Sequence, residues 1–545
     1  MRVVAMLGRR SSQRGLFDVI GLPHTVGPDS FYGRMGALHS VLFQDEDLAT
    51  MYTLDNGRPS LPPSMMCGVL LLQFYDDVSD GEAAERVKYD LRWKVALGLA
   101  LDYPGFDPSS LSVFRSRLLE HGKERYAFER FLKVGRQAGF LPDKATLLVD
   151  TVSAKGAGAV QDSYTLLRKG IRKLLKVMGY ELPGKRYGLG GRAKELVANY
   201  LDRDRKAQID WSDPVQRAEQ LGVLVRDAES VLEMALGQAD QEEVRAAGWL
   251  LTKILGDDIE GEEQGEPRIA QGTAADRVIS VTDPEMRHGR KSKAHRFDGY
   301  KVSVATEAGS ELIVDLADMP ASQGDGKELL PTVERVEEHA GVKVERVIAD
   351  GAYGSGDNLA GCAEHAVELV SPLRQSDGLR VDKGAFRIDL EGKRARCPQG
   401  QEAKGRRARD EKGRPVLKFV FERSKCERCP LFDRCVRGKE RGRVVTTNYH
   451  ESHLQAARRR QETAEFKEVY RTRSAVERKL AELVGHGLRA TRYIGEGKRR
   501  LQRLWTGAAV NLKRLLKLAQ ERGVALEEVL AYPGRILPQV GLIAA

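Results

Sequence analysis

Short apolar runs separated by charged and glycine-containing stretches recur along the whole chain, and their spacing changes from segment to segment. In residues 31–135 the apolar positions recur about one helical turn apart, which predicts several helices joined by tight turns. Ser79 and Glu82 have the spacing of a capping box at the start of one of them. We therefore expect a helical N-terminal domain over residues 1–135. The pattern fits a DNA-binding module of the helix-turn-helix type and a scaffold or dimerisation domain equally well.

Two short apolar runs further along the chain predict buried strands, and each leads to an aspartate. Residues 147–149 precede Asp150, and residues 344–349 precede Asp350. Between these runs, two strand-like segments flank a plausible hairpin turn at residues 309–310. Strand, hairpin and strand, with an acid at or near the ends of two strands, indicate an α/β layer with carboxylates at one sheet edge.

The other boundaries follow changes in the pattern. A long helical block ends in the acidic segment DDIEGEEQGE, and a later stretch without regular periodicity contains four cysteines. The expected order is core strands at 140–160 and 271–365, interrupted by a helical insertion at 161–270, then a cysteine-containing, β-rich insertion at 366–450, a C-terminal helical region at 451–520 and a peripheral tail at 521–545.

Length and composition agree with a folded protein of two to four domains. The chain has 545 residues, of which 41% are hydrophobic and 30% charged. It has no apolar run of about eighteen residues, so we expect no membrane span. The first residues lack the apolar middle of a secretory signal, which favours a cytoplasmic, nucleoid-associated protein with reduced thiols.

The positive charge is unevenly distributed. The net charge is only +10, but basic residues concentrate near 285–301, 393–443 and 456–517. Local positive surfaces on a nearly balanced protein point to a polyanion such as nucleic acid. The alternative is a set of solvated helix faces.

One acid, Glu477, lies in the cationic run RTRSAVERKLAEL. Tyr470, Arg473 and Glu477 have the spacing i, i+3, i+7, which would place them along one stripe of a helix. Glu477 would then either neutralise its neighbours or complete a site with Asp150 and Asp350. Three carboxylates can hold two Mg²⁺ ions, an arrangement that can carry out phosphodiester cleavage or transfer.

These residues resemble a known family. VDTVSAKG, VIADGAYGS and the triplet of Tyr470, Arg473 and Glu477 are similar to the three acid-bearing motifs of bacterial insertion-sequence transposases of the DDE type. The N-terminal helical stretches, RVISVTDPEMRHGRKSKAHRFDGYKVSVAT and NLKRLLKL also resemble one group of these proteins, so the likeness spans residues 20–520. In that family a lysine usually follows seven residues after the glutamate, and here Val484 stands in its place.

The resemblance implies an RNase H-like mixed sheet flanked by helices, with Asp150, Asp350 and Glu477 as catalytic residues. It implies two Mg²⁺ or Mn²⁺ ions, and double-stranded DNA as partner, both the terminal inverted repeats and the target. A homodimer on the DNA is also implied, because two ends must be brought together. The predicted DNA contacts are Tyr470, Arg473, Lys479, Arg489, Arg492, Arg290, Lys291 and Lys293, with Arg489 or Arg492 substituting for the missing lysine.

Three other aspartates near predicted strand ends compete for a role. Asp283 precedes a proline and is expected to cap a turn, with a supporting role beside the site or the DNA as the alternative. Asp315 and Asp318 are expected to be structural. Two alternatives to a transposase also remain open: a catalytically silent DNA-binding regulator and a nuclease that cuts without joining.

The four cysteines of the insertion are Cys397, Cys426, Cys429 and Cys435. A close C-x-x-C pair with two more thiols nearby favours a structural zinc ion in a reducing compartment. Unligated thiols or a redox role are the alternatives. Cys67 and Cys362 are expected to be ordinary buried thiols.

Overall fold

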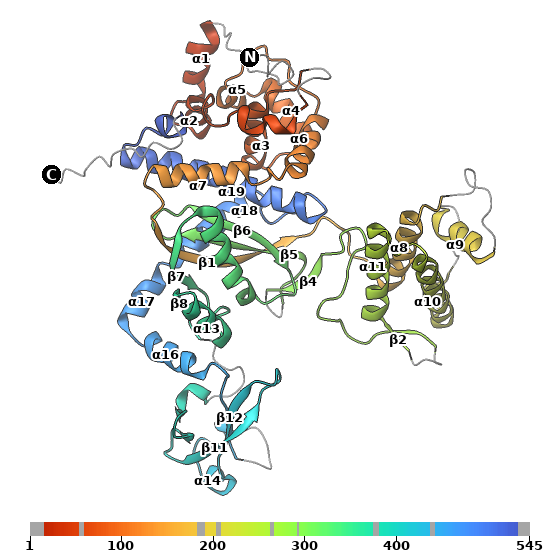
Figure 1. The fold of residues 1–545 in the computed structure, drawn as a ribbon, viewed down its shortest axis with the longest axis vertical. Helices are drawn as coiled ribbons and strands as arrows, with labels where there is room; N and C mark the ends of the chain where they lie inside the picture. The colour runs from red at the N-terminus through yellow and green to blue at the C-terminus, as the bar shows by residue number, and fades with distance from the viewer. Residues whose placement is uncertain are drawn as a thin grey trace, which may run out of the picture.

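A computed structural model of the chain describes residues 16–53, 59–181, 191–202, 209–261, 266–291, 294–373, 381–436 and 442–531. Figure 1 shows a central sheet with the N-terminal helices on one side, one insertion extending sideways and a second insertion at the opposite end. None of the helices in these ranges has the length and apolar character needed to cross a bilayer.

The central sheet is mixed, with strand order β4-β5-β1-β7-β8 and β6 paired with β5. β1 is antiparallel to β5 and parallel to β7, and β7 is parallel to β8. This sheet with its flanking helices is the predicted α/β, RNase H-like architecture. Its strands are β1 (Lys144–Lys155), β4 (Arg287–Arg290), β5 (Arg296–Glu307), β6 (Ile313–Pro320), β7 (Lys343–Ala349) and β8 (Glu368–Val370).

The N-terminal segment is helical, as its periodicity predicts. Ser79 accepts a hydrogen bond from the amide of Glu82 at 3.2 Å, so the predicted cap is formed. Before the helix that begins at Ser109, Asp107 accepts a hydrogen bond from the amide of Ser109 at 2.9 Å. The elements are α1 (Leu16–Val26), α2 (Phe31–Ala37), η1 (Glu46–Met51), α3 (Pro63–Tyr75), α4 (Asp80–Tyr89), α5 (Leu91–Leu97), α6 (Ser109–Glu120) and α7 (Tyr126–Gln137).

The N-terminal helices share one hydrophobic core with the sheet. The long helix α19 (Glu496–Arg522) lies between them and contributes to both sides. Trp505 of α19 donates to the carbonyl of Glu124 at 3.1 Å, and Asn511 bonds both the amide and the carbonyl of Ile313 at 2.8 Å. The N-terminal helices therefore pack directly on the core of the sheet and are not joined to it by a linker alone.

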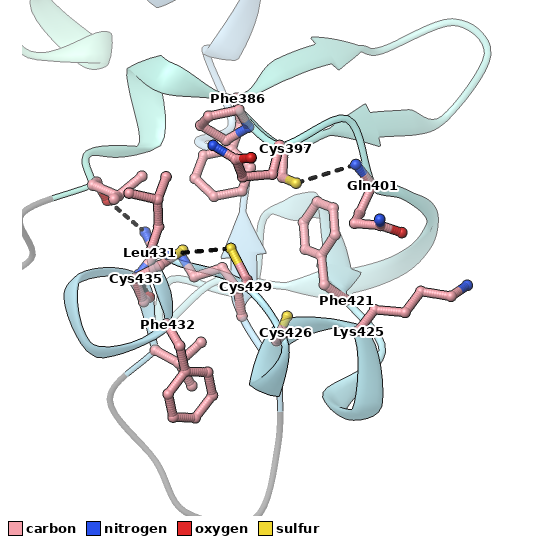
Figure 2. A pocket seen from close by; sticks show the side chains of 15 residues that line it. Phe386, Cys397, Gln401, Phe421, Lys425, Cys426, Cys429, Leu431, Phe432 and Cys435 are labelled. Carbon is pink, nitrogen blue, oxygen red and sulfur yellow. Dashed lines mark hydrogen bonds between the residues drawn. The ribbon is translucent and has the colours of Figure 1, made fainter.

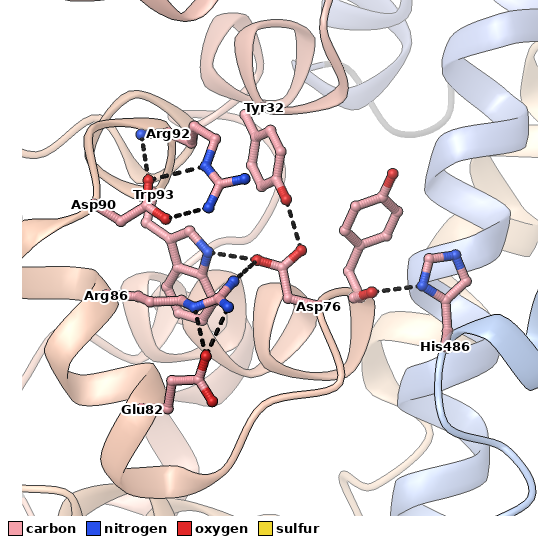
Figure 3. A network of polar contacts seen from close by, with 9 residues as sticks. Tyr32, Asp76, Glu82, Arg86, Asp90, Arg92, Trp93 and His486 are labelled. Carbon is pink, nitrogen blue, oxygen red and sulfur yellow. Dashed lines mark hydrogen bonds and ion pairs between the residues drawn. The ribbon is translucent and has the colours of Figure 1, made fainter.

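A buried carboxylate organises the junction of these helices (Figure 3). Asp76, at the end of α3, accepts from Tyr32 at 2.6 Å, from Arg86 at 2.6 Å and from the indole of Trp93 at 2.8 Å. Beside it, the ring of His486 is hydrogen-bonded to the carbonyl of Tyr75. A buried charge needs such partners, so the network fixes how the helices meet.

The helical insertion has its own hydrophobic cluster, separate from that of the sheet. Val278 and Val281 belong to it, so its packing extends beyond residue 270, and β4 begins only at Arg287. Its elements are α8 (Ser163–Val177), α9 (Gly191–Leu201), α10 (Pro214–Leu236), α11 (Glu242–Asp258), β2 (Ile259–Glu260) and β3 (Arg268–Ile269).

The cysteine-containing insertion is built on a five-stranded antiparallel sheet of order β13-β12-β11-β10-β9. Its hydrophobic cluster is small and includes Phe386, Phe419 and Phe421. Its elements are η4 (Lys383–Ala385), β9 (Arg387–Asp389), β10 (Arg394–Arg396), β11 (Glu402–Arg409), β12 (Pro415–Val420), α14 (Arg423–Glu427), α15 (Phe432–Cys435) and β13 (Val444–Thr446).

The remaining helices lie beside the central sheet, connect it to this insertion, or follow α19 near the C-terminus. They are η2 (Asp325–Glu328), α12 (Leu329–Arg335), η3 (Val336–Ala340), α13 (Gly356–Glu364), α16 (Glu451–Gln461), α17 (Ala464–Arg471), α18 (Ser474–Gly485) and α20 (Leu526–Ala531).

Candidate active site

Two of the predicted acids lie on adjacent strands. The parallel pairing of β1 with β7 ends at Val149 and Ala349. Asp150 directly follows the first of these residues, and Asp350 directly follows the second. Neighbouring strands are about 4.8 Å apart, so the two backbones carry their carboxylates side by side.

Asp150 does not end its strand, which corrects the sequence prediction. β1 continues to Lys155 because its antiparallel partner β5 remains paired with it as far as Gly299. Asp150 is instead the first residue of β1 beyond the reach of β7. The apolar run that precedes it lies within the part of β1 that pairs with β7 on one side and β5 on the other.

Arg473 connects the third motif to this edge. Its Nη2 donates to Oδ2 of Asp150 at 2.6 Å, and its Nη1 donates to Oε1 of Glu477 at 2.7 Å. Asp150 and Arg473 are 323 residues apart in the sequence. The fold thus joins residues of the first and third motifs through one guanidinium, while Asp350 directly follows β7, the strand beside β1.

Tyr470, Arg473 and Glu477 do not share one continuous helix, contrary to the sequence prediction. α17 ends at Arg471, and α18 begins at Ser474. The hydroxyl of Thr472 donates to the carbonyl of Val469 at 2.7 Å, and the amides of this turn bond three rather than four residues back. Such side-chain bonds compete with helix continuation.

The electrostatics of Asp150 reflect a crowded set of acids. Burial raises the pKa of the Asp150 carboxyl, and the negative charges of Asp350 and Asp325 raise it further. The amide of Thr151 and the guanidinium of Arg473 oppose these effects without cancelling them. A nearby cation therefore stabilises the ionised form of Asp150.

Sequence reasoning missed Asp325 and Tyr353. Asp325 begins η2 and forms an ion pair with Lys301 of β5 at 2.7 Å. The side chain of Asn358 donates to the carbonyls of Gly326 and Tyr353, both at 2.9 Å, so it fastens the η2 loop to the turn after Asp350. The flanking glycines of QGDGKE were the available signal, since they mark a tight turn.

Several predicted DNA contacts are placed differently. Lys479 is 5% exposed and pairs with Glu482 at 2.8 Å, so its amine does not face solvent, and that prediction was wrong. It lies on the buried side of α18 with Val476 and Leu483, and the many charged residues of this segment make that buried side difficult to recognise in the sequence. Arg492 is also engaged within the chain, where it donates to the carbonyl of Val78 at 2.6 Å.

The other cationic candidates stay at the surface. Arg489 is exposed beside the end of β1, where its carbonyl accepts from the amide of Lys155 at 2.7 Å. Arg290, the last residue of β4, and Lys291, which follows it, are exposed. Lys293 lies outside the described residues.

Asp283 is 1% exposed and accepts from the hydroxyl of Tyr300 at 2.5 Å. It therefore belongs to a buried network, not to a DNA-contacting surface. Asp315 and Asp318 are structural as predicted, since they pair with Arg335 at 2.8 Å and Arg503 at 3.1 Å.

The four cysteines of the insertion line one small cavity (Figure 2). The amide of Gln401 donates to Sγ of Cys397 at 3.2 Å, and the amide of Leu431 donates to Sγ of Cys429 at 3.4 Å. All six cysteines of the chain are free, and Cys67 and Cys362 are buried as predicted. As positioned, no three His, Cys, Asp or Glu side chains of the described residues are arranged to hold a metal ion.

Comparison with known families adds independent information. Residues 24–117 match the family described as Transposase domain (DUF772), and residues 396–516 match the family described as Transposase DDE domain. The second match contains Glu477 and Arg473, whereas Asp150 and Asp350 lie outside both. No curated protein and no solved structure shows a significant match to the chain. The two family matches, in the order expected from the motifs, identify the chain as an insertion-sequence transposase of the DDE type.

Proposed function

We propose that this transposase cuts DNA at the terminal inverted repeats of an insertion sequence and joins the freed 3′ ends to target DNA. Asp150, Asp350 and Glu477 are the proposed catalytic residues. Two copies of the chain are expected to act together, because two ends must be joined to one target. The observation that supports this proposal most directly is that Arg473 contacts both Asp150 and Glu477, at 2.6 and 2.7 Å.

The donor set suits Mg²⁺ or Mn²⁺, which prefer carboxylate oxygens. Two such ions, when bound, activate the attacking oxygen and stabilise the leaving oxygen. Asp150 and Asp350 would hold them from the sheet, and Glu477 would hold them from α18. The side chain of Glu477 is 60% exposed, so it can reorient toward the two aspartates.

Arg473 has a second role in this proposal. It occupies the space between Asp150 and Glu477, where its positive charge stabilises the carboxylates. A guanidinium also binds phosphate through paired N–H groups. We propose that Arg473 turns to the DNA phosphate as the acids take up metal, so that substrate binding opens the site.

Single substitutions test the assignment. Asp150→Ala, Asp350→Ala and Glu477→Ala should each reduce strand cleavage and joining by at least about 100-fold, the effect of losing one group that stabilises the transition state. Glu468→Ala, at an exposed position of α17, is the matched control. Retained activity in any one acid variant would remove that residue from the site. Nicked products without joined strands would instead indicate a nuclease, and DNA binding without cleavage would indicate a silent regulator.

We further propose that the cysteine-containing insertion holds a structural zinc ion. Supporting this are the shared cavity of the four thiols and the two amides directed at sulfur, since N–H donors favour the thiolate form. The side chains would have to rotate toward one another to reach ligand distances of about 2.3 Å. A small core such as this one gains most from a bound metal.

Elemental analysis of the purified chain tests the zinc proposal. We expect one zinc per chain, lost in Cys426→Ser/Cys429→Ser together with a lowered melting temperature. Cys362→Ala, which removes a buried thiol outside the cavity, should keep the zinc. A chain that contains no zinc, and whose melting temperature does not change on zinc addition, would refute the proposal.

A further inference from the structure

The five-stranded sheet of the cysteine-containing insertion has two unlike faces. One face packs on the hydrophobic cluster through Ala395, Ala403, Phe419 and Val445, all buried. The register places the alternate residues of the strands on the other face. Its cations, which we call the basic face, are Arg387, Arg394, Arg396, Lys404, Arg406 and Lys418; all are exposed except the half-buried Lys418.

Like charges stand directly opposite each other on this face. Arg394 is paired with Lys404 across β10 and β11, and Arg406 is paired with Lys418 across β11 and β12. Arg396 is likewise paired with Arg387. Like charges at directly opposed positions of a sheet are destabilising. The folded insertion therefore retains an electrostatic repulsion that the sequence could have avoided.

Nearby acids do not neutralise the basic face. Asp389 and Glu402 are the carboxylates that share it, opposite Arg394 and Arg396. Asp389 accepts from the amide of Gly392 at 2.9 Å. Within the part of the chain that the structure describes, none of the six cations belongs to an ion pair. A partner with regularly spaced negative charges would relieve the repulsion.

We propose that the basic face binds the phosphate backbone of duplex DNA. Lys404 and Arg406 are two residues apart on one strand, about 6.7 Å, and the neighbouring strands add cations at about 4.8 Å. This array can neutralise several phosphates at once, which provides affinity without sequence selectivity. The inference rests on the proposed function for the identity of the polyanion, but the insertion that carries this face lies at the end of the molecule away from β1 (Figure 1).

A double charge reversal separates binding from folding. Lys404→Glu/Lys418→Glu converts two repulsive cross-strand pairs into attractive ones, so the melting temperature should rise. Binding to a short duplex of arbitrary sequence should weaken. The slope of log K against log salt should become shallower by up to about 1.8, because each lost phosphate contact removes about 0.9. Lys133→Glu/Lys194→Glu makes the same charge change at exposed positions of α7 and α9 and serves as control.

Equal affinity and salt dependence in the two double variants would overturn the proposal. A fall in melting temperature together with lost binding would also overturn it, since the opposed cations would then not be the source of repulsion. Asp150→Ala should bind the duplex with an unchanged salt slope. A failure of the proposed catalysis is thereby distinguishable from a failure of this surface.

Discussion

Arg473 and Asp150 form an ion pair at 2.6 Å across 323 residues of sequence, in a place where both side chains are largely covered. The pair exists because β1 extends past β7 and because the chain turns sharply between α17 and α18. It holds a positive charge where acids from two strands would otherwise repel one another. Arg473 therefore links Asp150 to Glu477 through two ion pairs.

Replacing Arg473 should expose that repulsion. In the metal-free Arg473→Gln variant, the Asp150 carboxylate loses its counter-charge. We therefore expect the free energy of unfolding to fall by about 1–3 kcal/mol at neutral pH. Because the folded-state pKa of Asp150 would rise further, the loss should shrink as pH falls and Asp150 becomes protonated. Melting temperatures measured in chelator across the acid range check this.

Arg478→Gln is the control for that experiment. Arg478 lies on α18, the helix that begins directly after Arg473, but its side chain is 64% exposed and pairs with Glu311 at the surface. It should change stability by less than about 0.5 kcal/mol. A loss in Arg473→Gln that is the same at every pH would argue against the role of Asp150.

Asp150→Asn should remove activity without lowering stability. Burial and the neighbouring acids raise the pKa of Asp150 in the folded protein. The folded state therefore binds its proton more tightly than the unfolded state does, and ionisation costs stability once pH exceeds the unfolded value of about 3.9. A neutral amide avoids this cost, so the metal-free variant should melt higher than the parent at neutral pH, with the gain vanishing at low pH. A lower melting temperature at neutral pH would contradict the direction of the shift.

The chain order of the motifs and the class of the fold could be predicted because each depends on local pattern. The apolar runs before Asp150 and Asp350 are buried strands, and their apolar composition reflects that burial. The length of β1 could not be predicted, since it depends on a partner strand about 150 residues away. Likewise, the spacing of Tyr470, Arg473 and Glu477 fits one helix, and only the structure shows that the helix is broken between α17 and α18.

Charge runs were the least informative signal. The run around Glu477 predicts a cationic surface, yet Lys479 within it is buried against Glu482. Helical periodicity could have shown this, because Lys479 lies three residues after Val476 on the apolar side of α18. By contrast, the basic face of the insertion follows the strand period of two, which is visible only once the register is known.

Tyr353 and Tyr300 should respond in opposite ways to loss of the hydroxyl. Both are buried, but the hydroxyl of Tyr300 donates to Asp283, whereas that of Tyr353 has no hydrogen-bond partner among the described residues. Tyr300→Phe leaves a buried carboxylate without its donor and should cost about 1–3 kcal/mol. Tyr353→Phe removes an unsatisfied polar group and should be neutral or stabilising. Denaturant unfolding of the two variants checks this, and equal losses would show that the Tyr353 hydroxyl is satisfied in solution.

Gly326 and Gly324 offer a matched test of how the η2 loop supports the site. A Cβ at Gly326 would lie 2.8 Å from the carbonyl oxygen of Ala352 and 2.9 Å from the side-chain nitrogen Nδ2 of Asn358, whereas a Cβ at Gly324 would meet nothing within 4 Å. Gly326→Val must therefore push the loop away from the turn after Asp350, and overpacking of this kind costs about 1–3 kcal/mol. Because that turn positions Asp350, we expect strand cleavage to fall more than stability does. Gly324→Val should preserve both rate and melting temperature. Equal activity in the two variants would show that the contact between the loop and the turn has no part in positioning Asp350.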